Sequence, residues 1–406
     1  MDSIILVARA QTDVAHSTDR GRRRTLYVIA GGNFVVFGTR LLIGALVPFI
    51  LLDLQTTKSA LGLALSGMWA MYALGQFPSG ILADKYGERK LLVLGLTGTT
   101  LSAILVAFAP SILVFAVFLL LVGAGAGLYY SPATVLVTRL YDEHGSAIGV
   151  LAAFGAFAGL VYPTVGGFAV GYLDWRYVLA LTAVAGSTVL VAILTVIPRV
   201  PAVNADTSLR DTIHLHKYRN LLSRRSMVYT MALAVVFVFT FQGLTSFYPT
   251  FLVEYHDIDR GVAGGMLGGV LGVATVAQPL SGRFSDTVSR DAALGVSTAL
   301  ILTSLVALLA TQSMVGAVAG SVVLGLGISY PGPLQARFMD QLDETERGYG
   351  FGLVRTVYMF LGASGSVVVG ALADANGWVF AYAVVGGLLA CGLLLIAVNY
   401  LLGLEL

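Results

Sequence analysis

The chain has little charge and a single cysteine. Of its 406 residues, 11% are Asp, Glu, Lys or Arg, whereas a soluble domain carries about 25%. This deficit excludes a disordered chain, an ordinary cytosolic enzyme and a nucleic-acid-binding protein, which needs a basic face. The lone Cys391 excludes an internal disulfide and leaves the redox compartment undetermined.

The sequence also lacks the residue clusters that carry catalysis. Its five histidines lie outside the long apolar runs, and no spacing of histidine, cysteine and carboxylates is typical of a metal site. We find no glycine-rich phosphate-binding loop and no Ser/His/Asp set at a shared depth. We therefore expect that the protein is not an enzyme and uses no cofactor and no metal.

Apolar residues and glycine dominate instead. The chain is 57% hydrophobic with 48 glycines, and its mean hydropathy is +0.85. A helix needs about 20 apolar residues to cross the hydrocarbon core, and glycine allows helices to pack closely in lipid. Twelve runs are near or above that length: 25–52, 60–82, 91–109, 112–138, 147–173, 177–197, 227–253, 261–282, 292–311, 313–336, 348–373 and 378–402. They are too long and too evenly apolar for barrel strands, so they predict an all-α membrane protein with twelve transmembrane helices.

The basic residues outside these runs are unevenly distributed. If the N-terminus is cytoplasmic, 19 Lys and Arg fall on the cytoplasmic side and three, Lys58, Arg176 and Arg260, on the other. This bias predicts a multi-pass protein of the plasma membrane with both termini in the cytoplasm. We place the segments 1–24 and 198–226 there as well, the second as a solvated linker or an interfacial helix.

The two halves of the chain, 25–197 and 227–406, resemble each other. Matching residues recur about 202 positions apart, with Gly80 and Asp84 recurring as Gly282 and Asp286, and Trp175 as Trp378. Six spans per half make this a parallel repeat of two six-helix bundles related by a pseudo-twofold axis. In secondary transporters with such repeats, the substrate path lies between the halves near the bilayer midplane.

One loop carries a specific family resemblance. The segment Gly80–Lys90, GILADKYGERK, resembles the signature loop of the major facilitator superfamily at every position except Glu88, where the family usually has a base. Another family position differs too, because Leu119 stands in the fourth span where many members have an arginine. The resemblance implies the twelve-helix major facilitator fold and transport by alternating access.

A second segment is similar to the proline–diglycine motif of proton-linked antiporters in that superfamily. Pro163, Gly166 and Gly167 match the motif, but Tyr162 replaces its usual leading glycine, so antiport does not follow from it. Both segments imply a role in conformational gating. The residues assigned to gating are Gly80, Asp84, Gly87, Arg89, Arg139, Pro163, Gly166, Gly167 and Asp286.

Physical reasons support this role for the signature loop. Gly80 and Gly87 permit close helix approach and a tight turn, and Asp84 can accept hydrogen bonds from a helix N-terminus. The basic residues beside Asp84, such as Arg89, are expected to face anionic headgroups. Arg139 is expected to pair with Glu88 if the two lie close together. The alternative is that the loop is only a basic stop signal for membrane insertion.

Only two charged residues lie within the spans, Arg40 and Arg355. A charge at the bilayer centre costs at least about 2.5–3.5 kcal/mol, and no carboxylate lies in the spans to neutralise either arginine. The pair therefore predicts an anionic substrate, although Arg355 is near enough to the cytoplasmic side to extend toward it instead. Further candidates for substrate contact are Asn33, Tyr130, Gln242 and Tyr358.

The arginines also resemble those of the superfamily's anion-transporting branches. Arg40 followed by Pro48 is similar to the organophosphate/phosphate exchangers, and a base in the eleventh span is similar to the oxalate/formate exchangers. We expect a functional monomer that carries an organic anion, a carboxylate or an organophosphate, as a symporter or antiporter. Coupling to a proton and exchange for a counter-substrate both stay open. The alternative function is a proton-linked multidrug or small-molecule efflux antiporter.

Overall fold

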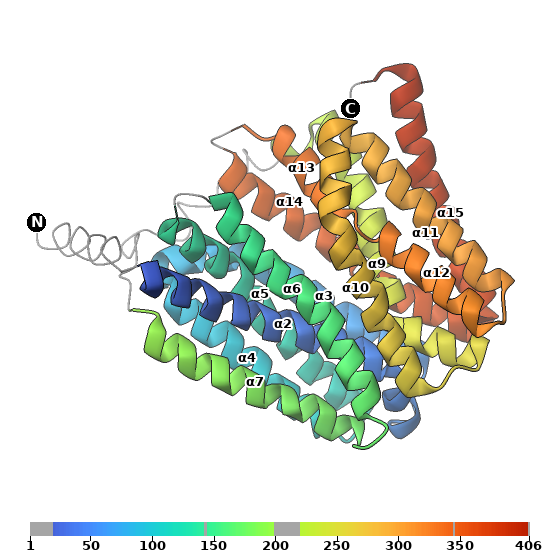
Figure 1. Cartoon of the computed structure of the whole chain (residues 1–406), viewed down its shortest axis with the longest axis horizontal. Helices are drawn as coiled ribbons and strands as arrows, with labels where there is room; N and C mark the ends of the chain where they lie inside the picture. Colours follow the sequence, from blue (N-terminus) through green and yellow to red (C-terminus); the bar gives the residue numbers. More distant parts are fainter. Residues whose placement is uncertain (1–18, 142–143, 199–219, 344–345, 405–406) are drawn as a thin grey trace, which may run out of the picture.

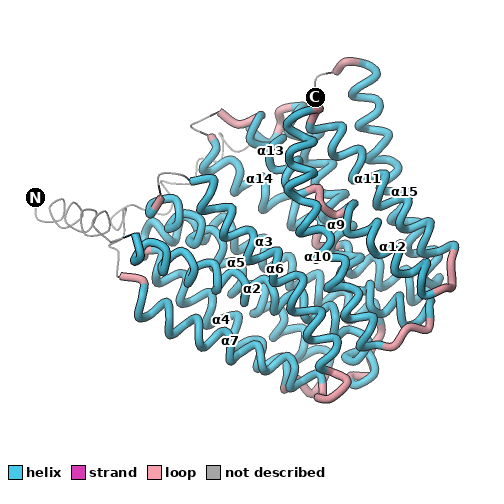
Figure 2. The backbone as a smooth tube through the Cα atoms, viewed as in Figure 1, coloured by secondary structure: helices cyan, strands magenta, loops and turns pink. Residues whose placement is uncertain are grey.

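The computed structural model describes residues 19–141, 144–198, 220–343 and 346–404 as helices joined by short turns, with no strand among them (Figures 1 and 2). The first half comprises α2 (Asp19–Asp53), α3 (Lys58–Tyr86), α4 (Glu88–Ala107), α5 (Ile112–Leu140), α6 (His144–Ala169) and α7 (Trp175–Val196). The second half comprises α9 (Arg225–His256), α10 (Arg260–Thr287), α11 (Arg290–Ala310), α12 (Met314–Gly327), α13 (Pro331–Asp340), α14 (Arg347–Gly362) and α15 (Gly365–Leu402). Most of the predicted segments 1–24 and 198–226 lies outside the described residues, so their placement and the domain boundaries stay predictions.

These helices make twelve membrane crossings in the described part of the chain. Ten stretches are long and apolar enough to span a bilayer, and one of them, Gly350–Leu402, contains two crossings. Its backbone leaves the helical region at Gly377, where φ is +79°. α3 supplies the remaining crossing with 29 residues, although polar side chains such as Gln76 lower its hydropathy. The predicted all-α fold of twelve helices in two six-helix bundles is confirmed.

The tenth and eleventh crossings are each broken near their middle. α12 ends at Gly327 and α13 starts at Pro331, which lacks a backbone N–H and therefore suits the first turn of a new helix. α14 ends at Gly362, and α15 resumes at Gly365. Both breaks lie in the second half, so its tenth and eleventh crossings differ from the corresponding crossings of the first half.

The two halves lie side by side, the first drawn in blue to green and the second in yellow to red (Figure 1). We call the end with the turns at Gly87, Tyr141 and Val288 the basic end, since it carries most of the Lys and Arg. The other end, with the turns near Gln55 and Asp257, is called the opposite end. The positive-inside rule predicts that the basic end is cytoplasmic.

Ionic and hydrogen-bonding contacts join the halves at the opposite end. The ammonium of Lys58, the first residue of α3, lies 3.0 Å from Glu254 of α9 and 3.7 Å from Asp374 of α15. The backbone N–H and the hydroxyl of Ser59 both donate to Asp374, each at 2.7 Å. We call the group formed by Lys58, Ser59, Glu254 and Asp374 the cross-half latch.

The latch has a counterpart within the first half that does not cross to the other half. There, Asp53 accepts from Arg176 at 2.6 Å and from the Trp175 indole at 3.3 Å. In the repeat, Glu254 accepts from the Trp378 indole at 2.9 Å, but Val379 stands where the arginine would be. Glu254 therefore takes its cation from Lys58 of the other half.

Close backbone packing also joins the halves toward the opposite end. Gly167 of α6 lies so near α10 that a Cβ built on it would be 2.6 Å from the Gly265 nitrogen and 2.8 Å from the Gly261 oxygen. A side chain at this position would separate the helices. Gly167 is the second glycine of the proline–diglycine segment, which therefore lies directly at the contact between the halves.

Three glycines toward the basic end have open space around them. A Cβ built on Gly80, Gly149 or Gly282 would meet no atom within 4 Å. The expectation that Gly80 permits a close helix approach is therefore wrong for this conformation. The latch and the packing at Gly167 thus join the halves toward the opposite end, and these three glycines add no close contact at the basic end.

We expect Lys58→Ala to loosen the opposite end. Two partly exposed ion pairs are together worth roughly 1–2 kcal/mol, which corresponds to a five- to thirtyfold change in the equilibrium between the joined and separated states of this end. The readout is the labelling rate of Ser66→Cys, in a Cys391→Ser background, because the Ser66 hydroxyl is buried and accepts from the Val367 N–H across the halves at 2.9 Å. Labelling should be faster by about that factor.

The repeat supplies a matched control for this experiment. Arg260 begins α10 as Lys58 begins α3, but it is exposed and forms no ion pair among the described residues. Arg260→Ala should leave the labelling rate unchanged. Equal rates in the Lys58→Ala and unmodified proteins would show that the latch does not hold the halves together.

The predicted sidedness is testable with single cysteines in the same Cys391→Ser background. Tyr172→Cys and Gln312→Cys, both exposed at the opposite end, should react with an impermeant thiol reagent added outside cells. Ser223→Cys and Lys90→Cys, exposed at the basic end, should react only after the membrane is opened. The reverse pattern would invert the predicted orientation.

Candidate functional site

A cavity of about 240 Å³ lies between the two halves. Its lining comes from the middle portions of α2, α3, α5 and α6 of the first half and of α9, α10, α13 and α14 of the second, including the break before α13. The lining is mainly apolar and aromatic. Its polar and ionisable residues are Asn33, Tyr72, Tyr130, Gln242, Thr275, Gln278, Tyr330, Gln335, Arg355 and Tyr358.

Arg355 is the only charged side chain in this lining, as far as the described residues show. Its guanidinium carbon lies 4.6 Å from the centroid of the Tyr130 ring, a cation–π contact between the halves. Its Nε is buried and has no hydrogen-bond partner among the described residues. Arg355 therefore faces the cavity, and the alternative that it extends toward the cytoplasmic side is wrong.

Arg40 lies beside the cavity but does not line it. Its side chain is 2% exposed, its Nε donates to the Val36 carbonyl at 3.2 Å, and its Nη1 has no hydrogen-bond partner in the described structure. Its guanidinium carbon is 3.8 Å from the Tyr72 ring centroid and 5.0 Å from that of Trp69. Direct contact between Arg40 and a substrate is therefore not available in this conformation.

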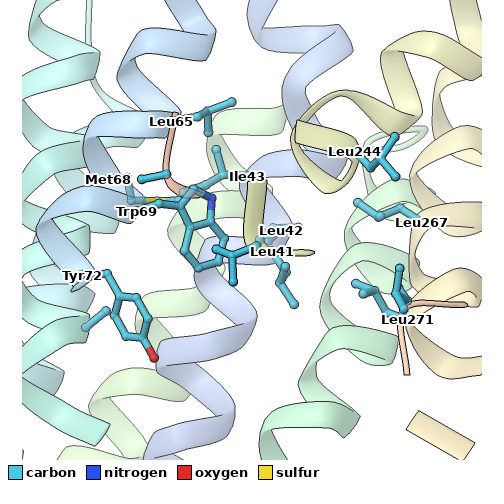
Figure 3. Close-up of a cluster of buried hydrophobic side chains, with 14 of the residues drawn as sticks. Leu41, Leu42, Ile43, Leu65, Met68, Trp69, Tyr72, Leu244, Leu267 and Leu271 are labelled. Atoms are coloured by element: carbon cyan, nitrogen blue, oxygen red, sulfur yellow. The ribbon is translucent and has the colours of Figure 1, made fainter. Parts of the chain in front are cut away.

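Tyr72 lies near both arginines. Its ring centroid is 3.8 Å from the guanidinium carbon of Arg40, and its hydroxyl lies within electrostatic range of both guanidinium groups, although Arg40 belongs to the first half and Arg355 to the second. Trp69 and Tyr72 project from the same side of α3 (Figure 3). The sequence analysis missed Tyr72, because the three-residue spacing of these aromatics indicates a shared helix face without showing where it points.

The other four predicted substrate residues all line the cavity. The Asn33 amide donates to the Leu151 carbonyl at 2.8 Å and thereby holds α2 against α6. The Gln242 amide oxygen is buried without a partner in the described residues, so it is available as an acceptor. Whether these four residues bind substrate stays a prediction.

At the basic end, Gly87 forms the tight turn between α3 and α4, with φ at +89°. Glu88, 1% exposed, forms the expected ion pair with Arg139, which also lies 3.4 Å from Asp84. The partner found for Asp84 is thus Arg139 and not a helix N-terminus. Partial burial raises the pKa of Asp84, and Arg139 opposes that shift. Arg89 donates to the α7 backbone at 2.6 Å, where headgroup contact was expected.

The same arrangement recurs in the second half. Asp291 stands 203 positions after Glu88, at the start of the ninth crossing, and pairs with Arg337 at the end of the tenth. Asp286, the counterpart of Asp84, pairs with Arg290. The acidic residue that departs from the signature loop is therefore matched by an acidic residue in the repeat.

Gly166 and Pro163 lie in α6 beside Gly167. A Cβ built on Gly166 would collide with the side chain of Leu42 from α2, so the glycine lets α6 lie close to α2. Pro163 lies inside the helix, where it removes one backbone hydrogen bond. The position of this segment is thus established, whereas its role in gating stays a prediction.

The sequence as a whole matches one family model. Residues 29–342, and again 261–403, match the model of the Major Facilitator Superfamily. The chain belongs to this superfamily. It is a membrane transporter and not an enzyme.

Solved structures of the superfamily share this fold. A bacterial homolog to the human lysosomal transporter Spinster, in an inward-facing and occupied conformation, has a TM-score of 0.77 at 16% identity and covers 95% of this chain and 98% of its own. The xylose transporter XylE from E. coli has a TM-score of 0.73 at 15% identity, with 93% and 98% covered. At such identities the likeness establishes the fold alone.

The relatives in sequence are named for different transported compounds. A probable hexose phosphate transport protein of Chlamydia pneumoniae is 29% identical over 157 residues, which are 38% of this chain and 34% of that protein. The probable sulfoacetate transporter SauU of Cupriavidus necator is 30% identical over 145 residues, 35% and 34% of the two chains. Multidrug resistance protein Stp of Mycobacterium tuberculosis is 28% identical over 179 residues, 42% and 33%. Each match spans about a third of the relative's length.

The ion pair between Glu88 and Arg139 yields a charge-reversal prediction. Glu88→Arg places two guanidinium groups together in a partly buried site and should destabilise the protein by roughly 1–3 kcal/mol. Adding Arg139→Glu restores an ion pair and should recover part of the loss. The measurement is the apparent unfolding temperature of the purified protein.

A charge reversal at the exposed Lys90, two residues away, is the control and should have little effect. If the defects of Glu88→Arg and Arg139→Glu simply add in the double variant, the two residues are not coupled.

Proposed function

We propose that this transporter moves a small organic anion, a carboxylate or an organophosphate, by alternating access. The observation that carries the proposal is the position of Arg355, the only charged side chain that lines the cavity in the described structure. A guanidinium at this depth carries an electrostatic cost that a bound anion relieves. Its planar fork also matches the geometry of carboxylate and phosphate groups.

The rest of the cavity supports an anion as well. Among the described residues, no Asp or Glu lines it, so nothing there would neutralise a cationic solute. Its volume of about 240 Å³ lies below the roughly 300–1,000 Å³ of pockets for drug-sized ligands, which favours a small solute. Amides such as those of Gln242 and Gln278 offer hydrogen bonds to a polar solute body.

The arrangement of the halves supports alternating access. They are joined at the opposite end by the cross-half latch and by Gly167, whereas Gly80, Gly149 and Gly282 toward the basic end make no close contact. If the basic end is cytoplasmic, as the positive-inside rule predicts, this conformation faces inward. We place the protein in the plasma membrane as a functional monomer with both termini in the cytoplasm. Coupling to a proton and exchange for a counter-substrate both remain compatible with the site.

The sequence relatives favour the same substrate class without deciding it. Two of them are named for hexose phosphate and sulfoacetate, which are both organic anions. A third is named for multidrug resistance and supports the alternative, a proton-linked multidrug or small-molecule efflux antiporter. No carboxylate in the described cavity lining would attract a cationic drug, which is evidence against this alternative.

Binding to the purified protein tests the proposal. Sugar phosphates, sulfoacetate and dicarboxylates should raise its apparent unfolding temperature, because a ligand that binds only the folded state stabilises it, and cationic drugs should not. Arg355→Ala removes charge-assisted hydrogen bonds and should weaken anion binding about ten- to hundredfold.

Arg355→Lys is the matched variant, since it keeps the charge and loses the fork, and its loss of affinity should be smaller. Gln335→Ala, a neutral substitution in the same lining, controls for simple disturbance of the cavity. Stabilisation by cationic drugs but by none of the anions would favour the efflux function.

A further inference from the structure

Arg40, the second intramembrane arginine, has an unsatisfied hydrogen-bond donor. Arg40 is deeply buried, and its Nη1 has no hydrogen-bond partner among the described residues. A buried donor without a partner is unfavourable and uncommon in native proteins, so an acceptor is expected to reach it in some state of the protein. No carboxylate of the described structure is placed to do so.

Three aromatic residues lie both against Arg40 and in the cavity lining. Phe37, Trp69 and Tyr72 all line the cavity, and their ring centroids lie 5.2, 5.0 and 3.8 Å from the guanidinium carbon of Arg40. Tyr72 is the nearest of the three. We call these three residues the aromatic cover.

Tyr72 is the member of the cover that can uncover Arg40. Its side chain lines the cavity, and its ring centroid lies 3.8 Å from the guanidinium carbon of Arg40. Its hydroxyl makes no hydrogen bond to the backbone in the described structure and lies within electrostatic range of both guanidinium groups. A phenol oxygen is a weaker partner for a guanidinium than an anion, because hydrogen bonds between two charged groups are shorter and stronger. An anionic group can therefore replace it.

We infer that Arg40 is a second anion subsite, covered by Tyr72 in this conformation, and that the protein selects solutes with an anionic group at each end. One group binds Arg355, and the other displaces the Tyr72 hydroxyl from Arg40. Such a solute bridges the first and second halves, whereas a solute with one anionic group leaves Arg40 covered. This inference rests on the proposed function and narrows its substrate class.

Matched pairs of anions test the inference by calorimetry on the purified protein. Sulfoacetate and succinate carry two anionic groups, and ethanesulfonate and butyrate are their single-charge counterparts. We expect ten- to hundredfold tighter binding of the doubly charged member of each pair, the range that corresponds to the loss of one charge-assisted hydrogen bond.

Substitutions then assign the preference to Arg40. Arg40→Gln should abolish the preference, bringing the affinity ratio close to one, while binding of ethanesulfonate and butyrate changes less than threefold. Arg355→Gln should weaken both members of each pair. Tyr72→Phe removes the competing hydroxyl and should tighten binding of the doubly charged anions alone. Gln335→Ala, in the same lining, should leave the ratio unchanged.

Three outcomes separate this inference from the proposed function. Binding of anions with no preference for two charges would overturn the inference and leave the proposed function intact. Equal weakening of both members by Arg40→Gln would also overturn it, because a remote charge acts on all anions alike. Binding of cationic drugs but of no anion would overturn the proposed function itself. If Arg40→Gln does not fold, Arg40→Lys and Tyr72→Phe still report the ratio.

Discussion

The burial of two guanidinium groups without a carboxylate is the constraint on which the central cavity depends. Arg40 and Arg355 lie on different halves, and their principal contacts are aromatic rings, that of Tyr72 for Arg40 and that of Tyr130 for Arg355. Cation–π contacts offset part of the cost of removing a charge from water, but they supply no counter-charge. A cavity built in this way suits the anionic ligand proposed above, which would contact both halves.

The repeat explains how two similar halves form an asymmetric transporter. At the opposite end, Asp53 is satisfied by Arg176 within the first half, whereas Glu254 takes Lys58 from across the interface. Val379 stands at the repeat position of Arg176, so the second half offers Glu254 no cation there. At the basic end, the acid–arginine pair between the third and fourth crossings recurs between the ninth and tenth. Internal pairs therefore stabilise each half, and the latch ties the halves to each other.

The two kinds of interhalf contact differ in how readily they separate. The latch consists of partly exposed charges, which water can solvate when the halves part, so breaking it is inexpensive. The packing around Gly167 depends on direct backbone contact, where no side chain has to be moved aside. An interface of this kind is suited to repeated opening and closing, because neither contact leaves a deeply buried charge or an empty core when it is broken.

The sequence alone determined the twelve crossings, the repeat and the two intramembrane charges. These properties follow from apolar run length and from the spacing of residues along the chain, which need no knowledge of helix rotation. Five of the six predicted substrate residues, Asn33, Tyr130, Gln242, Arg355 and Tyr358, line the cavity, whereas Arg40 does not. Tertiary structure alone decided that Tyr72 covers Arg40 and that Lys58 pairs with Glu254. Evenly apolar helices carry little signal for which face meets lipid, another helix or the cavity, and that rotation is fixed only when all twelve crossings pack together.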